Sequence, residues 1–78
     1  MTPEQCIAAR KLLGWNTREL GRRTGLNFMI IARWERGEHP YIGPMNAKLH
    51  AALEEAGVEF TSEASGLGVR LRIKDHAG

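Results

Sequence analysis

Residues 16–37 read NTRELGRRTGLNFMIIARWERG, and no other part of the chain constrains the expected fold as strongly. Asn16 is a favourable N-cap and Glu19 follows three residues later, so a helix is expected to start directly after Asn16, capped from both sides. Gly25 is expected to end that helix, because glycine readily takes the positive-φ backbone of a helix terminus. Asn27 then caps a second helix that runs to the end of the stretch. The pattern predicts two short helices joined by a tight turn.

Two short helices joined by a glycine-containing turn have the outline of a helix-turn-helix, whose second helix can enter the major groove of duplex DNA. The outline alone is common, so the placement of the side chains matters more. One set of apolar residues falls where both helices would face a common core, while polar and basic residues stay outside. The inward set is Leu20, Leu26, Ile31 and Trp34, and the outward set is Thr17, Arg18, Arg22, Arg33 and Arg36.

The segment WNTRELGRRTGLNFMIIARWERGE resembles the helix-turn-helix of the lambda-repressor/Cro-like (XRE-type) family of small bacterial and phage transcriptional regulators. The similarity is strongest over residues 12–38, and ARWERGE is its most specific part. A weaker likeness continues through LHAALEEAGVEF and GVRLR. The resemblance implies a mainly α, compact domain of four to five helices with a C-terminal β-hairpin or dimerising strand. It also implies a role in phages, integrative elements or toxin-antitoxin operons.

Length and composition exclude several classes of protein. A chain of 78 residues is expected to form one domain with a marginal core. The single Cys6 excludes an internal disulfide, and the absence of a long apolar run or signal peptide speaks against a membrane role, so a cytoplasmic protein is expected. No paired carboxylates, activated nucleophile or metal-ligand set can be assembled. We therefore expect no enzyme, no metal, no cofactor and no small-molecule effector.

Charge is distributed unevenly along the chain. Residues 1–43 carry seven Lys and Arg against four Asp and Glu, whereas residues 44–78 carry four against five. The basic part contains the two helices of the motif, as attraction to DNA phosphates would favour. On charge alone, an equally good interpretation is that these arginines are solvated on exposed helix faces and bind no DNA.

Arg10 occupies an unusual position in the first expected helix, which Thr2 is expected to cap. It shares one face with Cys6, which is expected to be a small core residue, so the arginine would point inward and need a partner. Glu35 is the candidate, because a negative charge near the C-terminal end of a helix is unfavourable unless something offsets it. The family resemblance implies that Arg10 and Glu35 form a partly buried ion pair.

The second helix of the motif departs from the resembled family at its first exposed positions, which are usually polar there. Here Phe28, Met29 and Ile30 occupy them. In one interpretation Phe28 and Met29 pack against thymine methyl groups while Arg33 bonds to guanine, so that all three contact bases. In the other, the apolar tip binds a protein and DNA binding is weakened.

Contacts with DNA phosphates are expected on both sides of that helix. Asn16, Thr17 and Arg18 stand at the start of the first motif helix, where amide groups and side chains can hold a phosphate together. Arg36, together with Tyr41 in the loop that follows, is expected to grip phosphates flanking the groove.

The C-terminal third is expected to hold a last helix over residues 44–56 and then a β tail. Residues 58–60 alternate like a strand, residues 61–68 are expected to form a polar loop, and residues 69–74 alternate strictly. A lone two-stranded hairpin is marginal in water. It becomes stable if its apolar face packs on the last helix and its edge pairs with a second copy.

The tail is therefore expected to build a homodimer. Val69, Leu71 and Ile73 would lie on its apolar side and form the dimer contact. The expected division is a helix-turn-helix DNA-binding domain over residues 1–57 and a dimerisation element over residues 58–78.

Three functions remain open from the sequence. The favoured one is a transcriptional regulator that binds an inverted repeat in double-stranded DNA as a homodimer, with no chemistry involved. A DNA-architectural or recombination accessory protein would use the same motif with less specificity. An antitoxin-type interaction module would dock a partner protein through the apolar tip or the tail.

Overall fold

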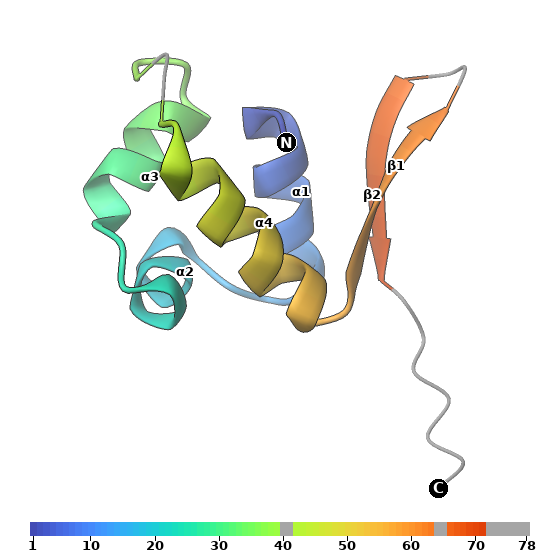
Figure 1. Ribbon diagram of the computed structural model, residues 1–78, viewed down its shortest axis with the longest axis horizontal. Coiled ribbons are helices and arrows are strands. Elements are labelled where there is room, and N and C mark those ends of the chain that lie inside the picture. The colour runs from blue at the N-terminus through green and yellow to red at the C-terminus, as the bar shows by residue number, and fades with distance from the viewer. Residues whose placement is uncertain (40–41, 64–65, 72–78) are drawn as a thin grey trace, which may run out of the picture.

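The computed structural model contains α1 (Pro3–Leu12), α2 (Thr17–Thr24), α3 (Phe28–Glu35) and α4 (Pro44–Glu55), followed by strands β1 (Val58–Glu63) and β2 (Gly66–Leu71) (Figure 1). It describes residues 1–39, 42–63 and 66–71, and gives only the backbone for 62, 63, 66 and 67. α3 lies at one end of the molecule and the hairpin at the other, with α1 and α4 between them (Figure 1). The fold is mainly helical with a small antiparallel hairpin, as expected from the sequence.

Side-chain caps start the first three helices. Thr2 accepts a hydrogen bond from the Gln5 amide at 3.1 Å, and the Gln5 side chain accepts one from the Thr2 amide at 3.0 Å. Asn16 accepts from the Glu19 amide at 2.8 Å, but the Glu19 carboxylate does not complete the expected reciprocal cap. It instead bonds to two arginines further along α2. Asn27 caps α3 by accepting from the Met29 amide at 2.8 Å.

One core serves both the helices and the hairpin. Side chains from every helix and from β1 are fully or almost fully buried in it, and Phe60 and Val69 pack against it from the hairpin. Leu26, expected inside, is only half-buried. The buried apolar residues are Cys6, Ala9, Leu20, Ile31, Trp34, Ile42, Leu49, Leu53 and Val58.

Arg10 and Glu35 join α1 to the end of α3. The Arg10 Nη2 atom lies 2.8 Å from Glu35 Oε1, and Nε donates to Oε2 at 2.9 Å, so the contact is bidentate. The exposed fractions of the two side chains are 16% and 4%. Arg10 Nη1 also donates to the Trp15 carbonyl at 3.3 Å. This is the pair implied by the family resemblance, and it offsets the charge of Glu35 near the C-terminal end of α3.

Cys6 is fully buried beside this pair. Burial raises the pKa of the Cys6 thiol strongly, and the nearby Glu35 carboxylate raises it further. The thiol therefore stays protonated and acts as a core side chain.

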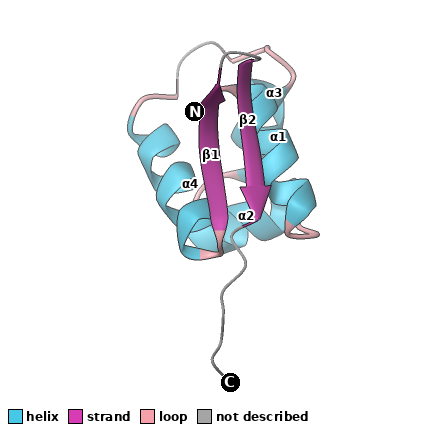
Figure 2. Ribbon diagram, turned by 90° about the vertical axis from the view of Figure 1, so that its right-hand side faces the viewer, coloured by secondary structure: helices cyan, strands magenta, loops and turns pink. Residues whose placement is uncertain are grey.

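The hairpin lies across the helices, with β1 toward α4 and β2 toward α1 (Figure 2). Antiparallel pairing aligns Val58 with Leu71 and Phe60 with Val69, and Val58, Phe60 and Val69 all join the core. The expected packing of the hairpin on the last helix is confirmed, and the hairpin also packs on α1. One contact between α1 and β2 is a hydrogen bond that the Gln5 side chain donates to the Gly68 carbonyl at 3.3 Å.

β1 extends further than the sequence suggested, and β2 begins three residues earlier. The expected loop over residues 61–68 is wrong, because β1 continues to Glu63 and β2 begins at Gly66. The His50 side chain of α4 stacks on the Phe60 ring, with ring centroids 4.3 Å apart, and holds the middle of β1. Ile73 lies outside the described residues.

We expect Arg10→Met to lower the free energy of unfolding by about 3 kcal/mol, because it leaves the buried Glu35 carboxylate without its cation. For a domain of this size that loss corresponds to a fall of roughly 10 °C or more in the melting temperature. Thermal unfolding followed by circular dichroism measures the change.

The control is Arg22→Met, which removes an exposed arginine paired with Glu19. Exposed pairs contribute little, so its melting temperature should stay close to that of the wild type. Equal melting temperatures for the two variants would show that the buried pair contributes no more to stability than an exposed pair.

Candidate nucleic-acid interface

The turn between α2 and α3 brings the two helices into direct contact. Gly25 ends α2 with φ 74°, and the Leu26 amide donates to the Gly21 carbonyl at 3.1 Å. A Cβ atom on Gly21 would lie 2.8 Å from the Leu26 carbonyl oxygen and 3.0 Å from Phe28 Cβ. Any side chain at Gly21 would therefore push the helices apart. No role was predicted for Gly21 from the sequence, although a glycine inside a helical pattern is a signal of close packing.

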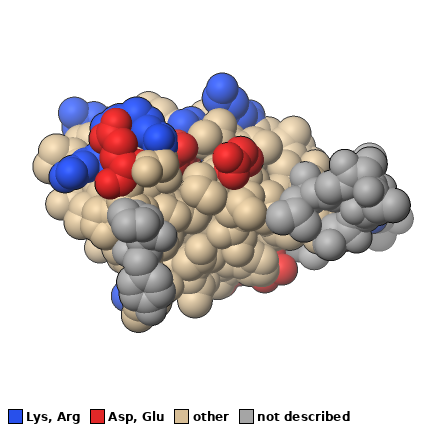
Figure 3. Space-filling view, turned by 90° about the horizontal axis from the view of Figure 1, so that it is seen from above, with Lys and Arg blue, Asp and Glu red and all other residues tan. Residues whose placement is uncertain are grey.

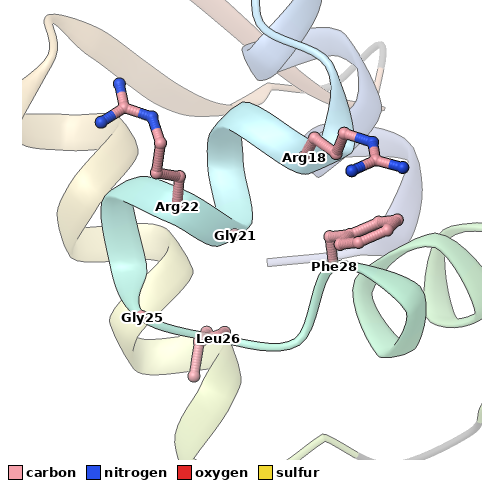
Figure 4. A pocket seen from close by; sticks show the side chains of 6 residues that line it. All are labelled: Arg18, Gly21, Arg22, Gly25, Leu26 and Phe28. Carbon is pink, nitrogen blue, oxygen red and sulfur yellow. The ribbon is translucent and has the colours of Figure 1, made fainter.

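This contact places Phe28 under Arg18. The Arg18 guanidinium carbon lies 4.6 Å from the centroid of the Phe28 ring, a cation–π geometry. The two side chains close one side of an open hollow of about 410 Å³ between α2 and α3 (Figure 4). Its remaining lining residues are Gly21, Arg22, Gly25 and Leu26.

The expected apolar tip of α3 is not one continuous exposed surface. Met29 is 57% exposed, whereas Phe28 is half-buried and Ile30 packs against the core. Arg33, one turn after Met29, is exposed, and within the described part of the chain it makes no ion pair of 4.0 Å or less, although its charge helps to lower the pKa of Glu38. Met29 and Arg33 are therefore the side chains that project most freely from the exposed side of α3.

Most arginines around α3 have a carboxylate partner. Arg22 and Arg23 both contact Glu19, each at 2.6 Å, and Arg36 contacts Glu38 at 3.1 Å. Hydrogen bonding to Arg22 lowers the pKa of Glu19, and hydrogen bonding to Arg36 lowers that of Glu38, so both carboxylates stay charged near neutral pH. DNA phosphates would have to compete with them.

Figure 3 shows Lys and Arg gathered at the α3 end of the molecule and along the adjoining side, with acidic side chains among them. The rest of this face is mostly uncharged. The surface is therefore basic, but less strongly than the number of arginines suggests.

The structure places the other candidate DNA contacts as follows. Asn16 and Thr17 stand at the start of α2, and the Asn16 side-chain oxygen is engaged in the helix cap. Arg36 lies at the end of α3 and is exposed. Tyr41 lies outside the described residues.

Of the expected dimer contacts, Val69 is half-buried and packs on the protein's own core. Leu71 is 44% exposed at the end of β2. On the other side of the hairpin, Arg70 Nε contacts Glu59 Oε1 at 2.6 Å.

Within residues 1–39, 42–63 and 66–71, no three His, Cys, Asp or Glu side chains are grouped so that they could hold a metal ion. Nor is any helix of this part of the chain long and apolar enough to cross a membrane. Comparison with models of protein families and with curated protein sequences finds no match to this chain.

Proposed function

We propose that the protein is a sequence-specific transcriptional regulator whose α2, turn and α3 form a helix-turn-helix on double-stranded DNA. The observation that carries the proposal is the exposed side of α3, where Met29 and Arg33 project beside Arg18 of the closely packed α2. A rigid helix with one exposed arginine and one exposed apolar side chain suits the major groove. The arginine can bond to guanine, and the methionine can contact a thymine methyl group.

The surroundings of α3 support the same proposal. Arg18 at the start of α2 and Arg36 at the end of α3 flank the exposed helix face. Phosphate contacts on either side of a helix fix its position in the groove and so allow its base contacts to specify sequence. Binding would regulate transcription by occupying DNA near a promoter.

We propose further that the functional form is a homodimer built on the hairpin. In the described sheet β2 pairs only with β1, which leaves its second edge to a partner strand, and Leu71 exposes apolar surface at the end of that strand. The hairpin and α3 lie at opposite ends of the molecule (Figure 1). Two copies joined at the hairpin would present two α3 helices to an inverted repeat, with half-sites separated by a whole number of helical turns of ~34 Å each.

The protein-docking alternative loses its main support. Docking through the tip of α3 would need a continuous apolar surface at Phe28, Met29 and Ile30, and only Met29 is strongly exposed, so that alternative now depends on the tail. An architectural role differs from the proposal in sequence preference, which a binding assay against random competitor DNA measures.

Arg33→Ala and Arg36→Ala should have different effects on binding. Arg33→Ala should cost about 1–3 kcal/mol and relax preference at one base pair, because it removes a base contact. Arg36→Ala should weaken binding to all duplexes alike. Gel shifts at fixed salt, on a preferred duplex and its single-base variants, measure both effects.

Glu38→Gln is the matched control, since it frees Arg36 from its carboxylate partner. It should raise affinity for every duplex, because it also removes a negative charge that acts on Arg33. If Arg33→Ala and Arg36→Ala shift every duplex by the same factor, the division between base contact and phosphate contact is wrong.

Leu71→Gln should raise the dimer dissociation constant at least about tenfold, because both copies lose apolar burial in a symmetric interface. Sedimentation equilibrium over a concentration series measures this constant. The matched control is Met29→Gln, which replaces an exposed apolar side chain at the other end of the molecule and should leave the constant unchanged. A wild-type chain that stays monomeric at all concentrations would contradict the dimer.

A further inference from the structure

The hollow between α2 and α3 combines a basic rim with an apolar floor. Arg18 and Arg22 stand on α2, while Gly25, Leu26 and Phe28 line the turn and the start of α3 (Figure 4). The hollow is wide open, so it does not enclose a small molecule. Its chemistry fits a ligand that carries a negative charge next to a compact carbon surface.

Arg18 is the cation of this rim that is available to such a ligand. Arg22 contacts Glu19, whereas Arg18 has no carboxylate partner within residues 1–39, 42–63 and 66–71. The Arg18 guanidinium carbon lies over the Phe28 ring. A cation–π contact holds the guanidinium in place without using its N–H groups as conventional hydrogen-bond donors, so they can still donate to a ligand.

Phe28 is poorly placed to select a base. Its side chain is half-buried in the junction between the helices, and the Arg18 guanidinium covers one face of its ring. Met29, the next residue, is 57% exposed and projects more freely. The Phe28 ring therefore contacts Arg18 and lines the hollow, and is less available to contact a thymine methyl group.

We infer that this hollow holds one sugar-phosphate unit of duplex DNA. Arg18 donates hydrogen bonds to the phosphate oxygens, and the Phe28 ring contacts the C–H face of the neighbouring deoxyribose. Phe28 is also a positioning residue, because its ring sets the orientation of Arg18. The inference rests on the proposed function and changes the expected role of Phe28 from a base contact to a backbone contact.

The inference couples the two residues. Removing the Phe28 ring should disturb the orientation of Arg18 and also remove the sugar contact. Once Arg18 is removed, the ring should contribute little to DNA affinity. Contacts to sugar and phosphate carry no direct sequence information, so both losses should be equal on all duplexes.

The test uses Arg18→Gln, Phe28→Leu, the double variant and Phe28→Tyr, with affinities measured by fluorescence anisotropy on a preferred duplex and its single-base variants. Arg18→Gln and Phe28→Leu should each weaken binding to every duplex by about tenfold. The double variant should bind about as well as the weaker single variant. Phe28→Tyr keeps the ring and should bind like the wild type.

Two further readouts separate this role from a general loss of structure. Arg18→Gln should reduce the slope of log affinity against log salt by about one, as for a lost phosphate contact. Met29→Ala, the control on the exposed helix face, should change the ranking of the duplexes.

A Phe28→Leu variant that alters preference at one base pair would show that Phe28 contacts a base, and would overturn the inference while leaving the proposed function intact. Strictly additive losses for the two residues would also overturn it. A wild-type protein that binds no duplex in competition would overturn the proposed function itself.

Discussion

The direct contact between α2 and α3 at Gly21 is the constraint on which the proposed interface depends. The Leu26 carbonyl and Phe28 Cβ fill the space in which any side chain at Gly21 would begin. Because the helices touch there, Phe28 lies under Arg18, and the exposed side of α3 keeps a fixed position relative to the start of α2. Such rigidity matters to a helix proposed to enter a groove, since its phosphate contacts set where its base contacts fall.

The other end of α3 is fixed by a different force. Arg10 of α1 bonds to Glu35 in bidentate fashion, and the carboxylate is almost completely buried. A small domain has a small hydrophobic core. An ion pair that fixes the position of α1 against α3 therefore adds to the apolar packing around it. The hairpin then closes the same core through Val58, Phe60 and Val69. The stability of the proposed interface is therefore tied to elements at the far end of the molecule.

Local rules predicted the helices and made Glu35 the candidate partner of Arg10, because each of these two charged residues is unfavourable where it stands unless the other is near. The ion pair itself was implied by the family resemblance. The predicted loop over residues 61–68 was wrong, since the glycines and polar residues there are typical of a loop but lie largely in strands. Their pairing depends on the register set by the docked apolar face, which sequence alternation alone does not reveal. The orientation of Phe28 and the pairing of Arg36 with Glu38 likewise arise from tertiary contacts and rotamers that helical periodicity does not encode.

The most direct test of the central claim is methylation protection of guanine N7, an atom in the major groove, on a duplex selected by the protein from a random pool. We expect protected guanines in two half-sites related by two-fold symmetry and separated by a whole number of helical turns of ~34 Å each. A duplex that is bound while every guanine N7 stays fully reactive would contradict the claim that α3 lies in the major groove.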